Sequence, residues 1–189
     1  MTGAAFHFFD TPIGRCAIIW RGALVIGAAL PDQDEERAEL SLQRRFPGAR
    51  EEAPSPAIMK AVDAVVRLLS GEPEKFSSIE IDLSAVGEFE RAVLEATFAI
   101  PPGETRTYGE MAAAVGSPGA ARAAGRALGA NPIPIIVPCH RVLASDGKSG
   151  GFSAPGGSAT KLKMLEIEGA RRGTEPGLFD RLPWRTKPL

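Results

Sequence analysis

The alternation of apolar and polar positions in the first half of the chain predicts a small sheet flanked by helices. Stretches rich in Ile, Val, Phe and Trp are separated by turns at Thr11–Gly14 and Arg21–Gly22, as in an antiparallel meander. Ile79–Leu83 alternates apolar and polar residues and predicts a further half-buried strand. Apolar residues at helical spacing predict helices over Asp32–Arg45 and Ser55–Ser70, so the first half is of the α+β type. The expected strands of the meander cover Phe6–Phe9, Cys16–Trp20 and Leu24–Ala29.

From Gly87 onward the pattern predicts short helices. A first helix follows Gly87 and ends at the Pro101–Gly103 turn. Two Ala-rich segments, Tyr108–Val115 and Pro118–Ala130, come next and are joined by the Gly116–Gly119 turn. Two helices across such a turn are typical of a helix-turn-helix. Helical hairpins are also common packing units, so the motif alone leaves DNA binding open.

The remainder of the chain is rich in Pro and Gly. The prolines of Asn131–Pro138 predict an extended segment, because a residue before proline avoids α geometry. Gly150–Gly157 is predicted to be a loop and Thr160–Gly169 a last helix. The pattern leaves open whether the apolar patch of the tail packs on the body. The chain is thus divided into an N-terminal unit, a C-terminal unit and a tail, at residues 1–86, 87–170 and 171–189.

Composition excludes several classes of protein. The chain has 189 residues with 44% hydrophobic and 24% charged residues, which are ordinary globular proportions. The longest apolar run, Ala23–Leu30, is far short of the roughly 20 residues that a membrane helix needs. The N-terminus has no basic patch followed by an apolar stretch. Two cysteines build no disulfide framework and no CxxC zinc site. We expect a cytoplasmic protein without metal, cofactor or membrane partner.

Charge differs between the two halves of the chain. Residues 1–86 hold 9 basic and 13 acidic residues, whereas residues 87–189 hold 13 basic and 10 acidic ones. Within Arg106–Val142 the charged residues are four arginines and Glu110. This asymmetry favours an anionic partner for the second half, although chance drift of charge along the chain explains it as well.

Cys139 is the candidate nucleophile. A thiolate, not a thiol, is the reactive form, and a nearby imidazole or guanidinium stabilises it. The tetrapeptide Pro138–Arg141 supplies both groups, and His140 is one of only two histidines in the chain. In a strand Cys139 and His140 would point to opposite faces, so a direct interaction requires the chain to turn at Cys139. The alternative is a buried small apolar residue beside an ordinary histidine.

The residues around Cys139 resemble the active-site signature of the O6-alkylguanine-DNA alkyltransferases, also called methylated-DNA–protein-cysteine methyltransferases. The signature comprises Asn131-Pro132 followed by Ile135–Val142. The resemblance covers residues 87–170 closely and the first half only at Asp10–Gly14. Its further matching positions are Thr107–Glu110, Ala120–Ala123, Gly151–Ser153, Lys161 and Glu168-Gly169.

The resemblance implies both a fold and an activity. The fold is α+β, with a small N-terminal α/β domain whose antiparallel sheet is ribonuclease-H-like. The C-terminal domain is mostly helical and of the winged helix-turn-helix type. The implied activity is DNA repair, in which a monomer moves the alkyl group of O6-alkylguanine in double-stranded DNA irreversibly to Cys139. A thioether has no labile leaving group, so each molecule acts once. Activity on O4-alkylthymine and the preference among alkyl groups stay open.

The resemblance also assigns catalytic roles. Cys139 attacks the alkyl carbon, and His140 with Glu168 draws the proton from the thiol through water. Asn131 braces the turn before the active-site segment, although an Asn after a helix is also an ordinary cap. Tyr108, the only tyrosine, donates to the guanine or to the departing purine; a core tyrosine is the alternative.

Substrate contacts follow from the same resemblance. The carbonyls of Cys139 and Val142 accept hydrogen bonds from the exocyclic amine of guanine. Ser153 donates toward the base, and Phe152 lines the wall of the pocket.

The helix-turn-helix is the expected DNA-binding element. A lesion inside a duplex must be flipped out at a cost of a few kcal/mol, and the resemblance assigns Arg122 to fill the vacated stack. Arg122 bound to a phosphate or to solvent is the alternative. Arg126, Ser117 and Ala121 complete the expected DNA contacts. Because Pro118–Ala130 is mostly Ala and Gly, few side chains can read base edges, which suits a shallow groove and weak sequence preference. The resemblance implies that this helix binds in the minor groove.

Some features depart from the family pattern. The loop from Ser153 to Lys161 is about two residues longer than usual, which leaves pocket width open. Arg126 stands where many members carry a small residue, and we expect it to contact a phosphate. The metal ligands that some members carry in the first half are missing, since only His7 and Cys16 are available there, and Cys16 is expected to be structural.

Two other classes of function compete with repair. One is a sensor that binds alkylated guanine without repairing it; such proteins replace the reactive cysteine, which is present here as Cys139. The other is a thiol hydrolase that uses Cys139 and His140. A hydrolase also needs an oxyanion site and a route for water, and the sequence has no separate motif for either.

Overall fold

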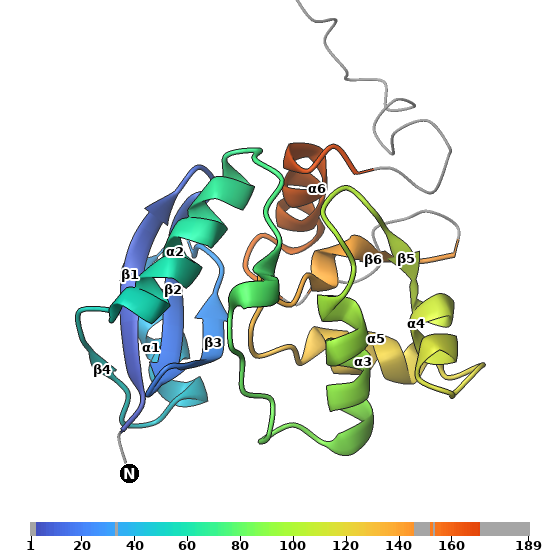
Figure 1. Ribbon diagram of the computed structural model, residues 1–189, viewed down its shortest axis with the longest axis horizontal. Helices are drawn as coiled ribbons and strands as arrows, with labels where there is room; N and C mark the ends of the chain where they lie inside the picture. The colour runs from blue at the N-terminus through green and yellow to red at the C-terminus, as the bar shows by residue number, and fades with distance from the viewer. Residues whose placement is uncertain (1–2, 33, 146–151, 153, 171–189) are drawn as a thin grey trace, which may run out of the picture.

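The computed structural model describes residues 3–32, 34–145, 152 and 154–170. The elements in this part of the chain form a mixed α+β fold, with the sheet on one side of the molecule and most of the later helices on the other (Figure 1). None of the helices found there is long and apolar enough to cross a membrane.

The N-terminal half contains a four-stranded sheet in the order β3-β2-β1-β4. The predicted meander is confirmed, since β1–β2 and β2–β3 pair antiparallel. The short fourth strand pairs parallel to β1, so the sheet is not entirely antiparallel as expected. The strands are β1 (Ala5–Thr11), β2 (Gly14–Arg21), β3 (Leu24–Ala29) and β4 (Arg50–Glu51).

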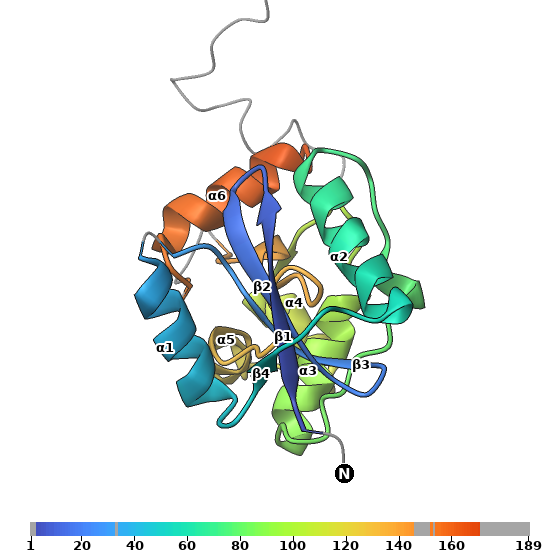
Figure 2. The ribbon, with the colours of Figure 1, turned by 90° about the vertical axis from the view of Figure 1, so that its left-hand side faces the viewer.

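Two helices cover opposite faces of this sheet, as the second view shows (Figure 2). Helix α1 (Glu35–Arg45) buries Leu42 against the face that carries Ile19. Helix α2 (Pro56–Leu69), capped by Ser55, packs on the face that carries Ile18. Both faces are therefore apolar, which explains why β2 is buried from Cys16 through Trp20 without alternation.

The predicted strand Ile79–Leu83 is wrong. The segment makes one isolated parallel bridge, Val25 to Ile81, along the free edge of β3. The amide of Val25 donates to the Glu80 carbonyl, and the amide of Asp82 donates to the Val25 carbonyl, both at 2.9 Å. A turn closed by the Val86 amide on the Leu83 carbonyl then takes the chain away from the sheet, so pairing stops after one bridge.

The C-terminal half is mostly helical, with a two-stranded parallel ladder, β5–β6. The two Ala-rich segments form helices, as predicted, and the second helix ends at Gly129. Thr107 and Glu110 form a capping box that starts the first of the two. The elements are α3 (Glu88–Phe98), β5 (Arg106–Thr107), α4 (Tyr108–Ala114), α5 (Ala121–Gly129), β6 (Val142–Leu143) and α6 (Gly157–Ile167), with short 3₁₀ turns at Phe76–Ser78 and Cys139–Arg141.

The prediction of an extended segment over Asn131–Pro138 is also wrong. The chain folds into a tight turn, in which the Val137 amide donates to the Ile133 carbonyl at 2.9 Å. Ile135 takes a positive φ of 74°, which a β-branched residue rarely adopts. The prolines exclude a helix, as expected, but they still allow a turn. The hydrogen bonds that close this turn include two made by the Asn131 side chain.

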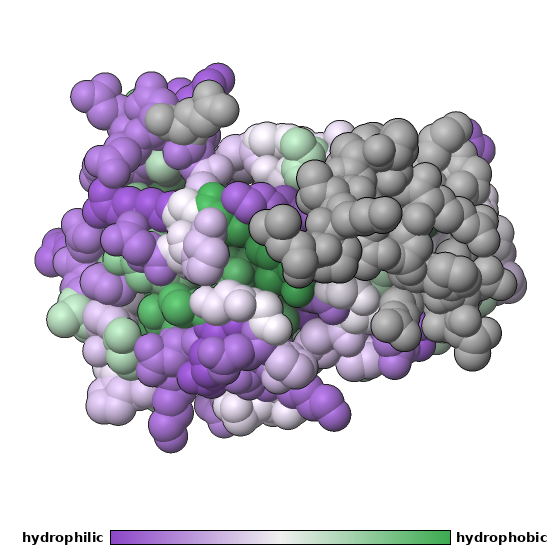
Figure 3. Space-filling view, turned by 90° about the horizontal axis from the view of Figure 1, so that it is seen from above, coloured by the Kyte–Doolittle hydropathy of each residue, from purple (hydrophilic) through white to green (hydrophobic). Residues whose placement is uncertain are grey.

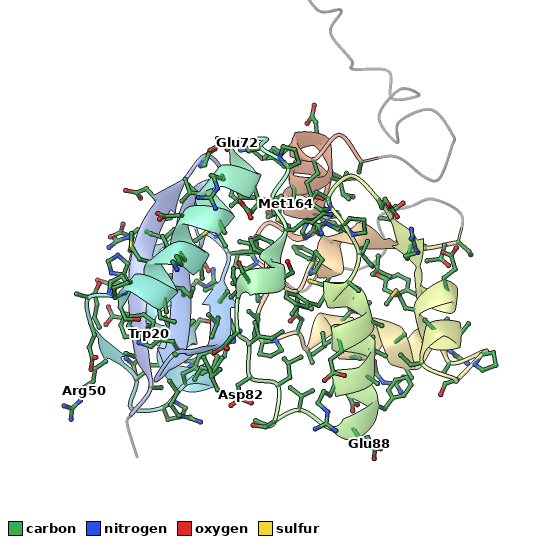
Figure 4. The ribbon with its side chains drawn as sticks, viewed as in Figure 1. Trp20, Arg50, Glu72, Asp82, Glu88 and Met164 are labelled. Carbon is green, nitrogen blue, oxygen red and sulfur yellow. The ribbon has the colours of Figure 1, made fainter. Side chains whose placement is uncertain are left out.

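One apolar core runs through both halves of the molecule. Trp20 of the sheet and Met164 of α6 belong to the same buried cluster, and both side chains are drawn in Figure 4. Seen from above, the described surface is mainly polar, with a recess in which apolar residues are visible (Figure 3). The continuous core keeps the sheet and the later helices in fixed relation, which positions the segment containing Cys139 between them.

Candidate active site and nucleic-acid face

Cys139 lies at the start of the 3₁₀ turn that precedes β6. The chain does turn at this residue, as a Cys139–His140 interaction was expected to require. The Cys139 side chain is buried, and its residue exposure is 7%, at the wall of a cleft of about 710 Å³. Burial raises the pKa of its thiol, so the thiolate needs compensating partners.

Asn131 supplies the first of these partners. Its side-chain amide donates to the Val137 carbonyl at 2.8 Å, and its oxygen accepts from the Ile133 amide at 3.0 Å. These two bonds close the turn before Cys139. A hydrogen bond from the Asn131 side chain to the sulfur lowers the pKa of the Cys139 thiol and so opposes part of the effect of burial.

His140, Arg141 and Glu168 form a buried charge cluster. Glu168 follows α6, and its side chain is 2% exposed. One carboxylate oxygen accepts from His140 Nε2 and from Arg141 Nη2, and the other from Arg141 Nε, each at 2.8 Å. Arg141 also donates to the Ile100 carbonyl. Arg141 thus neutralises Glu168 rather than the sulfur, a pairing that the sequence did not reveal.

The electrostatics of this cluster leave His140 neutral with a free acceptor nitrogen. Burial alone would raise the pKa of Glu168, but His140 and Arg141 outweigh it and hold that pKa at about 2. Burial lowers the pKa of His140, against the opposing charge of Glu168. The ionised Glu168 therefore holds the proton on Nε2. Nδ1 is buried and has no hydrogen-bond partner among the described atoms, so it can accept a proton.

Lys161 is a functional candidate that sequence reasoning missed. It is 0% exposed on α6. Its ammonium donates to the Val142 carbonyl at 2.6 Å. Burial lowers the pKa of Lys161 to about 8, and its charge favours the thiolate of Cys139. Its match to the family signature was the signal that pointed to it.

Aromatic residues frame the approach to the sulfur. Tyr108 is half-buried at the start of α4, and burial raises the pKa of its hydroxyl. The Lys161 ammonium lies 3.5 Å from the Tyr108 hydroxyl and 5.9 Å from the centre of the Phe152 ring. Tyr108, Phe152 and Cys139 line the same cleft, so the structure brings together these three predicted residues.

A second, open groove runs along α5. It has a volume of about 1100 Å³ and is lined by Ala121, Arg122 and Arg126. Both arginines are exposed. The groove shares Tyr108 and Phe152 with the cleft of Cys139, so the exposed basic surface adjoins the cleft that contains the sulfur.

Of the other two predicted residues, the structure describes only Ser117. Ser117 lies in the turn between α4 and α5, half-buried, and its amide donates to the Ala112 carbonyl; it does not line the groove. Ser153 lies outside the described residues, as do Gly150 and Gly151 of the glycine-rich loop and the tail 171–189.

Metal ligands and the second thiol, Cys16, were the other features considered from the sequence. No group of three or more His, Cys, Asp or Glu side chains that could hold a metal ion occurs among the described residues. Cys16 is 1% exposed in β2, and burial raises the pKa of its thiol to about 12, which suits the expected structural role.

Comparisons with known proteins point in one direction. The family model for the DNA-binding domain of 6-O-methylguanine DNA methyltransferase matches residues 88–170. A methylated-DNA–protein-cysteine methyltransferase of Mycobacterium tuberculosis is 38% identical over 93% of this chain and 98% of its own length. A crystal structure of M. tuberculosis OGT in complex with DNA has a TM-score of 0.72 and 35% identity, covering 87% of this chain and 92% of that one. The O6-methylguanine-DNA methyltransferase of Pyrococcus kodakaraensis has a TM-score of 0.65 and 27% identity, covering 87% and 99%.

Proposed function

Because this chain belongs to the family of methylated-DNA–protein-cysteine methyltransferases, we propose that it repairs O6-alkylguanine in double-stranded DNA by moving the alkyl group to Cys139. The observation that carries the proposal is the path from the exposed groove of Arg122 to the buried sulfur. DNA binds in the groove, and the base enters the cleft. The transfer is irreversible and stoichiometric, because a thioether offers no leaving group.

The reaction is an in-line displacement at the alkyl carbon. The bond from sulfur to carbon forms as the bond from carbon to O6 breaks, and the electron pair of that bond stays on the guanine. The thiol proton passes through a water molecule to His140 Nδ1, the buried nitrogen that has no hydrogen-bond partner within the described part of the chain. Glu168 stabilises the imidazolium that results. The departing purine takes a proton from Tyr108, which is then reprotonated from solvent.

Asn131 and Lys161 hold the sulfur in its reactive form. The amide of Asn131 donates to the thiolate and keeps the turn closed through Val137. Lys161 contributes positive charge. Its attraction to the sulfur becomes stronger when the thiol loses its proton and the sulfur becomes negative. Both groups are fixed before substrate arrives, so no reorganisation is needed at the moment of transfer.

The base is held by the walls of the cleft. The Cys139 and Val142 carbonyls accept from the exocyclic amine of guanine, with Val142 sharing its second lone pair with Lys161. Phe152 packs against the base, and Ser153 donates to it. O4-alkylthymine offers a similar alkoxy group, and we include it as a second substrate.

DNA is held by α5 in the minor groove. Arg122 fills the stack that the flipped base leaves, and Arg126 binds a phosphate. Ala121 lets the backbone approach closely, and Ser117 contacts the phosphate backbone from the preceding turn. The small side chains of α5 leave little for reading base edges, so repair has little sequence preference.

The finer architecture forms part of the same proposal. We divide the chain into an N-terminal domain of ribonuclease-H-like type at residues 1–86, a winged helix-turn-helix domain at 87–170, and a tail at 171–189. The protein acts as a monomer in the cytoplasm. The sheet order β3-β2-β1-β4 and the α4–α5 pair with the β5–β6 ladder support this division.

Intact mass measurement tests the function. The protein is incubated with a duplex that carries one O6-methylguanine, and each molecule is expected to gain the mass of one methylene on Cys139. Cys139→Ala must lose this gain, whereas the matched variant Cys16→Ala must keep it. Binding of the lesion without a mass change would instead identify a sensor. Repeated turnover of an ester without a stable adduct would identify a thiol hydrolase.

A further inference from the structure

The carbonyl of Pro132 is the point where the N-terminal half meets the segment that holds Cys139. It accepts from the backbone amide of Ala28 in β3 at 2.9 Å and from Arg45 Nη2 at 2.9 Å. The same guanidinium donates through Nη1 to the Ala28 carbonyl at 3.2 Å. Arg45 thus bridges two carbonyls that lie far apart in the sequence, 17 and 87 residues away.

The end of α1 is built to hold Arg45 at this place. Arg45 is the last residue of α1, and the ring of Phe46 lies directly over Gly27 of β3. A Cβ at Gly27 would lie only 2.3 Å from that ring, so the close approach requires glycine. The guanidinium of Arg45 in turn lies 5.3 Å from the centre of the Phe46 ring. Helix α1 is therefore fixed against β3 one residue before Ala28.

A short path leads from Pro132 to the residue that carries the sulfur. Pro132 follows Asn131 directly, and the Asn131 side chain donates to the Val137 carbonyl, which also accepts from the Cys139 amide at 2.8 Å. The same side chain lowers the pKa of the Cys139 thiol. Any movement of the Pro132 carbonyl moves the backbone from which the Asn131 side chain projects. Arg45, Pro132, Asn131 and Cys139 also line one cleft.

We propose that Arg45 is a positioning residue for the transfer reaction: by holding the Pro132 carbonyl, it places the Asn131 amide on the sulfur of Cys139. The inference rests on the proposed function only for the identity of the reaction. Arg45 touches neither base nor sulfur. The N-terminal sheet thus has a part in the chemistry, through a contact that the resemblance in sequence does not cover.

The test compares Arg45→Gln, Arg45→Lys and Arg44→Gln with the unaltered chain. Arg44 is exposed on the same turn of α1 and takes no part in the bridge, so it is the matched control. Labelling of Cys139 by iodoacetamide is followed over a range of pH by peptide mass, because this probe reports the thiolate without DNA or a substrate base. Transfer from free O6-benzylguanine is measured on the same samples, and thermal unfolding controls for folding.

Loss of the bridge is expected to raise the apparent pKa of Cys139 labelling and to slow both reactions about three- to tenfold, the range of one hydrogen bond. The labelling pKa and the two rates of Arg45→Lys should lie between those of the unaltered chain and those of Arg45→Gln, because an ammonium reaches one carbonyl but does not bridge two. If Arg45→Gln does not fold, the pH profile of Cys139 labelling in Arg45→Lys decides the question. An unchanged pH profile, even with a lower melting temperature, would overturn the proposal. Failure of the proposed function would look different: the unaltered chain would not react with O6-benzylguanine, while iodoacetamide labelling would still report the effect of Arg45.

Discussion

The buried cluster around Cys139 and the open groove of α5 differ in almost every physical respect. In the cluster, Glu168 and Arg141 are 2% exposed and each charge is matched within hydrogen-bond distance. In the groove, Arg122 and Arg126 are exposed and free to meet a phosphate or a stacked base. Burial makes each charge in the cluster strong and positionally fixed, whereas exposure keeps the groove adaptable to any sequence.

Because of this difference, we expect the transfer chemistry and the binding of DNA to be separable by mutation. A change in the cluster should alter the rate of transfer and the stability of the fold, but leave the affinity for duplex DNA unchanged. A change in the groove should do the reverse. Each experiment below tests that division, and a variant that affects both properties equally would break it.

The largest effect is expected for Glu168→Gln. The amide cannot stabilise the imidazolium of His140 and leaves Arg141 buried without its counter-charge, so transfer should slow on the order of 10²-fold and the melting temperature should fall. Transfer from O6-benzylguanine and duplex affinity are measured together, with the exposed Glu166→Gln as control. A loss of duplex affinity comparable to the loss of rate would contradict the relay.

Acid should act on the same relay through His140. Because burial holds the pKa of His140 below its usual 6.5, the neutral imidazole persists at neutral pH, and its acceptor nitrogen is lost only as pH falls through the lowered value. As the pH is lowered from about 7 to about 5, the rate of transfer from O6-benzylguanine should therefore stay level through pH 6.5 and fall only at lower pH. Duplex affinity, measured by fluorescence anisotropy, should not decrease over the same range. An inflection above pH 7 would exclude His140 as the base.

Arg122→Ala should separate binding of the lesion in a duplex from chemistry. Without the side chain that fills the vacated stack, repair in a duplex should slow about tenfold, since flipping costs a few kcal/mol. Reaction with O6-benzylguanine should stay within a factor of about two, because no base pair has to open. Arg37→Ala, exposed on α1, serves as the matched control. Equal losses with both substrates would show that Arg122 serves the chemistry instead.

The smallest effect is expected for Arg126→Ala. One lost phosphate contact should weaken binding uniformly across sequences and reduce the slope of log affinity against log salt by about 1. Titration of a fluorescent duplex at several salt concentrations measures the slope. A slope that does not change would place Arg126 outside the contact with DNA.

The predictions from sequence succeeded where the signal was local. The meander, α2 after Ser55 and the Ala-rich pair α4–α5 follow from apolar spacing and from residues at helix ends. Ile79–Leu83 and Asn131–Pro138 were wrong because pairing with β3 and the side-chain bonds of Asn131 decide those conformations, and both depend on tertiary contacts.

Only the site residues that belong to the sequence motif or to the family resemblance could be predicted. The tetrapeptide around Cys139 indicated the proposed nucleophile and its histidine, and the resemblance added Glu168, which follows α6. No pattern indicated that Lys161 is buried or that Arg141 pairs with Glu168, because a charged residue inside the protein breaks the rule by which inward positions are recognised.

The two thiols of the chain offer a practical measure of its state. Cys16 is sealed between the sheet and α2 with a thiol pKa of about 12, so it stays silent toward ordinary thiol reagents, while Cys139 faces a cleft. A thiol titration of the native protein therefore counts unspent molecules alone. In a protein consumed by its own reaction, that number is the remaining capacity for repair, and it can be read without any DNA.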